Sequence, residues 1–382
     1  MPSTATSTAS SDSKTTALNR YPWYSPRFWH GMRVRAYFGM LFRNRLRIHP
    51  ARWHMALAIA PVTFVNSFFY RVQNLFYGRR IRNTEIEHPP IFIVGHWRSG
   101  TTHLHELLVR DERFTFPTTY ECFAPNHFLI SDWCAAWTAG LFMPRVRPMD
   151  NMQAGLERPQ EDEFALCGMG APTPYLRMAF PNRPEPFGEL YNTDEAGAAD
   201  LERFKTALLR FVKTITVRRK QTVVLKSPPH TGRIGELAKL FPGARFIHIV
   251  RDPYATIPST QRLWHALDTA QGFQIPRHAT LDDLIFSTFN RMYAGFEHQR
   301  EEIPDDRLCE VRYEDLVENP LGQMERIYRE LDLGDFESAR PGLESYLSSQ
   351  KGYQPNRHKL SPDLKSAIDQ NCGSYQRKYG YD

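Results

Sequence analysis

Residues 95–102, with the sequence GHWRSGTT, have the composition of an anion-binding loop. An apolar run at 91–94 precedes them, and leucines at helical spacing follow over 103–110. A loop that joins a strand to a helix in this way turns backbone N–H groups and the positive end of the helix toward one point. The chemistry that this pattern predicts is the binding of a phosphate or sulfate group.

The spacing of the two glycines matches the nucleotide-binding pattern G-x-x-x-x-G-K-[ST], with one difference. Thr101 stands where that pattern has the lysine that holds the β- and γ-phosphates of a nucleoside triphosphate. The loop has Arg98 as its cation, and a guanidinium can bind two oxygens of a phosphate or sulfate at once. No obvious acidic ligand for Mg²⁺ ends a following strand. A kinase or hydrolase of this type is therefore only the alternative interpretation.

A second basic motif follows another apolar run. Residues 244–250 lead into Arg251, Asp252 and a proline, and Ser259 comes eight residues after the arginine. Open parallel sheets bind ligands at the carboxyl ends of their strands, so we expect Arg251 at the same sheet edge as the loop. Ser259 would point its hydroxyl from the next helix toward the same anion. A local ion pair between Arg251 and Asp252 at a helix start is the simpler alternative.

Together these motifs resemble those of the sulfotransferases that use 3′-phosphoadenosine 5′-phosphosulfate (PAPS). RSGTT at 98–102 resembles the 5′-phosphosulfate loop of that family, and 251 with 259 resembles its 3′-phosphate motif. VRYEDL at 311–316 is similar to a later stretch whose tyrosine lies near the nucleotide. An arginine at position 98 is more typical of the protein-tyrosine and bacterial branches of this family than of its cytosolic branch. The resemblance implies that the donor is bound by Arg98, Ser99, Gly100, Thr101, Thr102, Arg251, Ser259 and Tyr313.

Sulfuryl transfer needs cations on the leaving phosphate and a base for the proton of the acceptor, and fixed side chains can supply the positive charge without a metal. Arg98 is the candidate for stabilising the transition state. Lys226 ends the apolar run at 222–225 and resembles a catalytic lysine of the protein-tyrosine branch, which would assist the bridging oxygen of the leaving group. The alternative for Lys226 is an ordinary surface lysine on a loop.

Several residues are candidates for the base that accepts the proton of the acceptor. Glu121 lies beyond the first helix, roughly where the tyrosine-sulfating enzymes have a catalytic glutamate, and partial burial would raise the pKa of such a carboxyl. The competing residues are His127, His230 and the acidic cluster at 161–163. That cluster has the pattern of a solvated helix start, since acidic side chains favour the first turn of a helix.

Strands that alternate with helices predict a parallel sheet with crossover helices. Further strands are expected at 222–225 and 308–313, and a helix at 234–241 that ends at a Pro-Gly pair. We therefore expect an α/β protein with a P-loop-like three-layer fold, a central parallel sheet and flanking helices. The predicted organisation is a disordered tail at 1–19, a basic aromatic helical segment at 20–85 and a sulfotransferase domain at 86–382.

The basic aromatic segment carries an unusual share of the charge. Of the 48 Lys and Arg, thirteen lie between Ser13 and Thr84, where no Asp or Glu occurs, so 35 remain against all 42 acidic residues. Residues 53–70 are almost wholly apolar, but the run is short for a span of about 20 residues and contains a proline. Attachment of residues 20–80 to a membrane surface, packing on the globule or against another subunit, and a true span are the three interpretations.

Composition excludes several classes of protein. Five cysteines without a CxxC pair among 382 residues do not indicate a disulfide scaffold or structural zinc, and favour a reducing compartment. Basic charge confined to one segment argues against nucleic acid as the partner. We expect a cytoplasmic PAPS-dependent sulfotransferase, peripheral to the membrane if the segment binds lipid, that acts on a hydroxyl or amine of a small-molecule, lipid or glycan acceptor. A membrane-surface nucleotide-binding protein without catalysis is a third interpretation.

Overall fold

The computed structural model describes residues 26–134, 155–349 and 360–382, so the predicted tail at 1–19 lies outside the described residues. A parallel sheet of five strands forms the centre, in the order β2-β3-β1-β4-β5. The strands are β1 Ile91–Val94, β2 Phe114–Thr115, β3 Thr222–Lys226, β4 Arg245–Val250 and β5 Leu308–Arg312.

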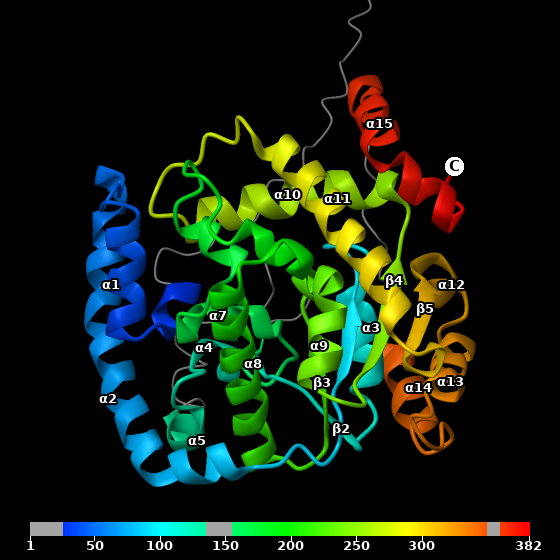
Figure 1. The fold of residues 1–382 in the computed structure, drawn as a ribbon, viewed down its shortest axis with the longest axis horizontal. Helices are drawn as coiled ribbons and strands as arrows, with labels where there is room; N and C mark the ends of the chain where they lie inside the picture. The colour runs from blue at the N-terminus through cyan, green and yellow to red at the C-terminus, as the bar shows by residue number, and fades with distance from the viewer. Residues whose placement is uncertain (1–25, 135–154, 350–359) are drawn as a thin grey trace, which may run out of the picture.

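Helices cover both faces of this sheet (Figure 1). The described α-helices are α1 Val34–Arg43, α2 Trp53–Asn83, α3 Thr101–Leu108, α4 Thr119–Phe123, α5 Phe128–Ser131, α7 Asp162–Met169, α8 Ala198–Arg218, α9 Ile234–Leu240, α10 Pro253–Gln271, α11 Leu281–Gln299, α12 Tyr313–Glu318, α13 Pro320–Glu330, α14 Arg340–Ser349 and α15 Pro362–Tyr379. Short 3₁₀ helices used below are η1 Phe28–Gly31, η4 Pro174–Ala179 and η7 Pro228–Arg233.

The three layers follow from the alternation of side chains along buried strands. Ile91 and Ile93 of β1 pack in one apolar cluster with the leucines of α3 and apolar residues of α13 and α14. Phe92 and Val94 point to the opposite face and pack in a second cluster that includes residues of α8, α9, α10 and α11. The predicted α/β three-layer fold with a central parallel sheet is confirmed.

The strands expected near 91–94, 222–225, 244–250 and 308–313 are all present, and the helices expected at 103–110 and 234–241 are α3 and α9. The prediction missed β2, which has two residues and pairs with β3 through Phe114 and Thr115. Two residues are too few to show a period in the sequence, so only the neighbouring strand defines this one.

The strand order sets the position of the loop at 95–102. From the central β1 the chain reaches β2 and β3 on one side, and then β4 and β5 on the other. The order therefore reverses beside β1, and a crevice at the carboxyl ends of the strands is expected at such a point. The loop at 95–102, Lys226, Arg251 and Tyr313 lie at or directly after the carboxyl ends of β1, β3, β4 and β5.

The N-terminal segment packs against this globule and shares its core. Trp29 of η1, Tyr37 of α1 and Ile59 of α2 are fully buried in the same apolar cluster as β1. On the inner side of α2, the amide of Asn66 donates to the carbonyl of Met32 (3.0 Å), and that of Gln73 donates to the carbonyl of Asn126 (3.1 Å).

With its preceding turn, α2 is the one helix in the described part of the chain that is long and apolar enough to cross a membrane, judged by length and composition over Pro50–Asn83. Its inner face is fixed to the globule by the bonds of Asn66 and Gln73, which a bilayer cannot replace. The structure therefore favours packing on the globule over a span for this face of α2.

Candidate functional site

The loop at 95–102 turns sharply between β1 and α3, and glycine is required at both of its ends. Gly95 and Gly100 have φ angles of +144° and +105°, a region that other residues rarely adopt. A Cβ atom at Gly100 would lie 2.2 Å from the ring of Tyr313, so this tyrosine packs directly on the loop backbone. Arg98 also has a positive φ of 68°, which is a strained conformation typical of functional loops.

The two predicted basic motifs meet in one place. The Nε–H of Arg98 donates to the Ser259 hydroxyl at 2.9 Å, although 161 positions separate the two residues. The guanidinium of Arg251 donates to the carbonyl oxygen of Arg98 at 3.0 Å and lies 4.0 Å from the ring centre of Tyr313. Four of the predicted donor-binding residues from three separate segments therefore contact one another at the carboxyl edge of the sheet.

Lys226 lies beside the start of α3. Its ammonium group donates to the Thr102 hydroxyl at 3.4 Å and to a carboxylate oxygen of Glu161 at 2.8 Å. The Lys226 side chain is only 3% exposed, which excludes the interpretation of an ordinary surface lysine. Glu161 keeps 16% of its side chain exposed, so its carboxylate is the more accessible partner of the pair.

A short hydrogen-bond chain holds the second oxygen of Glu161. The hydroxyl of Tyr175 in η4 donates to this oxygen at 2.6 Å, and the indole N–H of Trp97 donates to the Tyr175 oxygen at 2.8 Å. Burial, and then the nearby charge of Glu161, raise the pKa of Tyr175 well above its ordinary value, so this phenol stays a donor. Trp97 belongs to the loop, so the chain of hydrogen bonds ties the loop to Glu161.

The rest of the acidic cluster is buried, which corrects the prediction of a solvated helix start. The helix itself is present as α7, but Asp162 and Glu163 are fully buried. Asp162 binds the His230 ring at 2.7 Å, and Glu163 binds the guanidinium of Arg233 at 2.8 Å. Burial would raise the pKa of Asp162, but its bonds to His230 and Ser227 outweigh burial and lower it. These pairs fix the segment that presents Glu161.

Glu121 has a different environment. Both of its carboxylate oxygens accept from the guanidinium of Arg219, at 2.7 and 2.6 Å, and one also accepts from the backbone N–H of Thr118 at 2.9 Å. These bonds link the start of α4 to the residue after α8, and Glu121 is fully buried.

His127, another candidate for the base, lies between α2 and α5. Its ring nitrogens bond to Asn66 and Ser131 at 3.1 and 2.8 Å. Burial lowers the pKa of His127 to about 4, so the ring is neutral at physiological pH.

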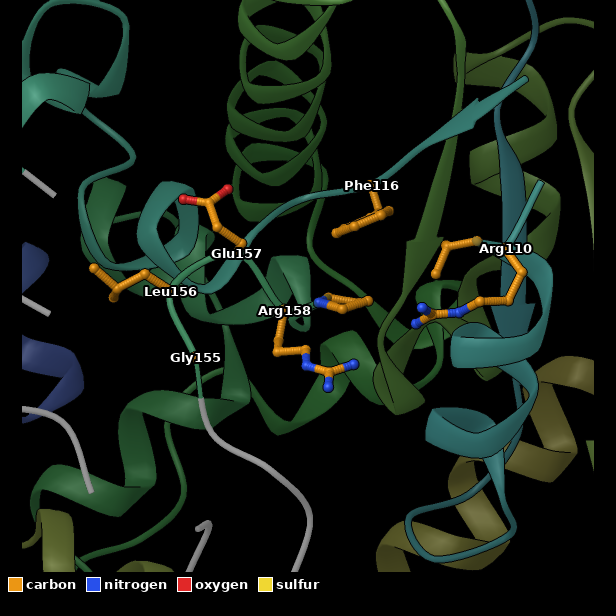
Figure 2. Close-up of a pocket in the computed structure, with 8 residues that line it drawn as sticks. Arg110, Phe116, Gly155, Leu156, Glu157 and Arg158 are labelled. Atoms are coloured by element: carbon orange, nitrogen blue, oxygen red, sulfur yellow. The ribbon is translucent and has the colours of Figure 1, made fainter. Parts of the chain in front are cut away.

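A cavity of about 380 Å³ lies between the residues that directly follow α3, Phe116 after β2, and residues 155–159 (Figure 2). Thr102 and Glu106 are four residues apart on one face of α3, and Arg110 follows two residues after the end of the helix. Glu106 forms ion pairs with Arg110 and with Arg158, the latter at 3.3 Å. The cavity is lined by Val109, Arg110, Phe116, Gly155, Leu156, Glu157, Arg158 and Pro159.

The sequence indicated some of the residues that surround Lys226 and not others. Glu161 was a candidate only as one of a cluster, and Tyr175 had no signal because it lies in an irregular segment far from both motifs. Trp97 lies inside the loop motif, but its role depends on a partner 78 positions away. Across the described residues, no group of three or more His, Cys, Asp or Glu side chains is placed to hold a metal ion.

Comparison with known proteins defines the class. The model of the sulfotransferase family matches residues 89–337, and this chain belongs to that family. The chain is therefore an enzyme that transfers a sulfuryl group, and the kinase or hydrolase alternative is not favoured.

Individual relatives agree with this class. The chain is 44% identical over 365 residues, which cover 96% of it and 94% of the relative, to proteins named omega-hydroxy-beta-dihydromenaquinone-9 sulfotransferase Stf3 from Mycobacterium bovis and Mycobacterium tuberculosis. Among solved structures, sulfotransferase STF9 from Mycobacterium avium matches with a TM-score of 0.64 at 19% identity, covering 90% of this chain and 95% of that one. Sulfotransferase STF1 from Mycobacterium tuberculosis matches with a TM-score of 0.62 at 15% identity, covering 92% and 94%.

Proposed function

We propose that this protein transfers the sulfuryl group of PAPS to a hydroxyl group of an isoprenoid quinone-type lipid at the cytoplasmic side of a membrane. The observation that carries the proposal is that Arg98, Arg251 and Ser259 contact one another while Lys226 contacts Glu161 and Thr102 of the same loop, all at the carboxyl edge of one sheet. Three cationic side chains there match the three negative groups of the donor, which are a 3′-phosphate, a 5′-phosphate and a sulfate.

The residues present fit this donor. The hydroxyl of Ser99 is buried and has no hydrogen-bond partner among the described residues, so it has a donor to offer to an anion held by the loop. Backbone N–H groups at the start of α3 would bind the 5′-phosphosulfate, together with Thr101 and Thr102. Arg251 and Ser259 would hold the 3′-phosphate, and Arg98, which bonds to Ser259, would bridge the two ends.

The chemistry assigned to the site is an in-line displacement at sulfur. The acceptor oxygen forms a bond to sulfur while the bond from sulfur to the bridging phosphate oxygen breaks, which leaves 3′-phosphoadenosine 5′-phosphate (PAP). Lys226 would donate an N–H hydrogen bond to that bridging oxygen as negative charge develops on it. Glu161 would accept the proton of the acceptor hydroxyl.

We assign the base to Glu161 in preference to Glu121 on accessibility. Glu121 is fully buried, and its oxygens accept hydrogen bonds from Arg219 and from a backbone N–H group, so it presents no exposed oxygen to an acceptor hydroxyl. Glu161 keeps 16% of its side chain exposed, and Lys226 and Tyr175 each donate a hydrogen bond to one of its oxygens, which fixes its position.

The choice of acceptor rests on the relatives and on the cavity that follows α3. The relatives are named for an omega-hydroxylated dihydromenaquinone, which is a lipid with a terminal hydroxyl. The cavity of about 380 Å³ has apolar lining from Val109, Phe116 and Leu156, and Val109 directly follows the end of α3. We propose that it holds the apolar chain of the acceptor next to its reacting end.

The proposal is tested with ³⁵S-labelled PAPS, purified protein and two acceptor pools, an organic lipid extract of membranes and the water-soluble fraction of the same cells. We expect label in the lipid pool and equimolar PAP. Label only in the water-soluble pool contradicts the lipid acceptor, and failure to bind PAP in a calorimetric titration contradicts the donor.

A further inference from the structure

The outward face of α2 is apolar and exposed along much of its length. Five residues, which we call the outer strip, are spaced by 4, 7, 4 and 7 positions, so they return to the same side of a helix with 3.6 residues per turn. The strip extends about 33 Å at a rise of 1.5 Å per residue. Its members, with exposed fractions from 41% to 78%, are Trp53, Leu57, Phe64, Phe68 and Leu75.

The strip lies opposite the face of α2 that packs on the globule. The buried residues of α2 include Met55, Ile59, Asn66 and Gln73, which fall on the other side of the helix. An exposed apolar surface of this length is unusual in a soluble protein and indicates a contact with another apolar body. Because the inner face is already fixed to the globule, α2 cannot bury the strip by turning over.

Two arginines without a described partner stand beside the strip. A cavity of about 830 Å³ between α1 and α2 is lined by Phe64 and Phe68 of the strip, and also by Arg35 and Arg71. Both arginines are exposed, and neither forms a hydrogen bond or ion pair with any described residue. The sequence from Ser13 to Thr84 contains no acidic residue that could neutralise them. The cavity thus combines an apolar wall with two exposed guanidinium groups.

We propose that this face docks on a bilayer that contains anionic phospholipid. The outer strip enters the acyl-chain boundary, and Arg35 and Arg71 bind a lipid phosphate at the mouth of the cavity between α1 and α2. In Figure 1, α1 and α2 run side by side along one edge of the molecule, with α12, α13 and α14 at the opposite edge. Helix α2 therefore lies in the plane of the membrane surface and the globule remains in water.

The basic residues beside the outer strip favour an anionic lipid surface, rather than a second copy of this chain, as its partner. Two copies that met through this face would bring two sets of basic residues together without acidic partners, which costs free energy. An anionic bilayer offers apolar chains to the strip and phosphates to the arginines at the same time. This inference does not depend on the identity of the acceptor or on catalysis, so its failure is distinguishable from failure of the proposed function.

The test is flotation of the full chain with vesicles of phosphatidylcholine alone and with about 30 mol % phosphatidylglycerol. We expect binding to the anionic vesicles that weakens as salt is raised. Arg35→Gln with Arg71→Gln should weaken it roughly 30-fold, since each basic residue near an anionic surface contributes about one kcal/mol. Phe64→Ser with Phe68→Ser should weaken it by roughly 100-fold, because two large apolar side chains leave the bilayer.

Matched controls lie on the opposite edge of the molecule. Arg307→Gln removes an exposed arginine, and Val317→Ser removes an apolar side chain that is 50% exposed in α12. Neither should change flotation by more than twofold, and all variants should bind PAP as the native chain does. Equal flotation with both vesicle types, an equal loss in the controls, or a dimer that hides the strip and does not float overturns the proposal.

Discussion

Replacing Lys226 by methionine removes the ammonium group and keeps most of the side-chain volume. The ammonium lies 2.8 Å from Glu161 and 3.4 Å from the Thr102 hydroxyl, and the side chain is 3% exposed. The charge is therefore held in place before substrate arrives, in a site from which water is largely excluded. Such a fixed donor acts on developing charge without the cost of reorganisation.

The size of the effect follows from the removal of a single fixed donor. Loss of one pre-positioned donor to developing negative charge lowers kcat by about 10² to 10³, or about 3–4 kcal/mol of transition-state stabilisation. The cost in folding free energy should be about 1–3 kcal/mol, because Glu161 loses its cation but keeps the Tyr175 hydroxyl and some exposure to water. Affinity for PAP, which lacks the sulfate, should fall less than tenfold.

The assay measures PAP release from PAPS with the lipid extract as acceptor, alongside calorimetric binding of PAP and thermal unfolding. Lys239→Met is the matched control, because this lysine is 61% exposed and its ion pairs with Glu236 and Glu302 lie on the surface. An unchanged kcat, or a fall in PAP affinity as large as the fall in kcat, refutes a role for Lys226 in the transition state.

Three further outcomes are expected. Arg98→Ala and Arg251→Ala should each weaken PAP binding by at least tenfold in calorimetry, while Arg307→Ala leaves it unchanged; equal affinity in all three contradicts the donor assignment. Val109→Trp fills the cavity beside α3, so it should raise KM for the lipid acceptor and leave PAP affinity as it was. Burial holds the pKa of His127 at about 4 in the folded chain, against an ordinary value of 6.5, so only the unfolded chain gains this proton between those values. His127 should therefore contribute about 3 kcal/mol to the fall in the free energy of unfolding as pH decreases from 6.5 to 4, and His127→Gln should remove that contribution in denaturant titrations.

Both motifs to which we assign anion binding could be located in the sequence because each is local. The glycines at 95 and 100 meet backbone requirements that depend on near neighbours in the chain, and Arg251 directly follows a strand whose apolar pattern is visible. The parallel sheet followed from the same patterns, since strands that alternate with helices leave few arrangements. Only β2 was missed, because two residues carry no period.

The sequence by itself determined the chemistry class and the sheet edge at which the motifs would gather. Only the tertiary structure distinguishes Glu161, partly exposed beside Lys226, from Glu121, fully buried on Arg219, because these partners lie 65 and 98 positions away. Likewise, the sequence showed an almost wholly apolar run at 53–70 without indicating which side packs, and the bonds of Asn66 and Gln73 define the inner and outer faces of α2. Interactions between distant segments depend on the packing of the whole chain, and local patterns do not contain them.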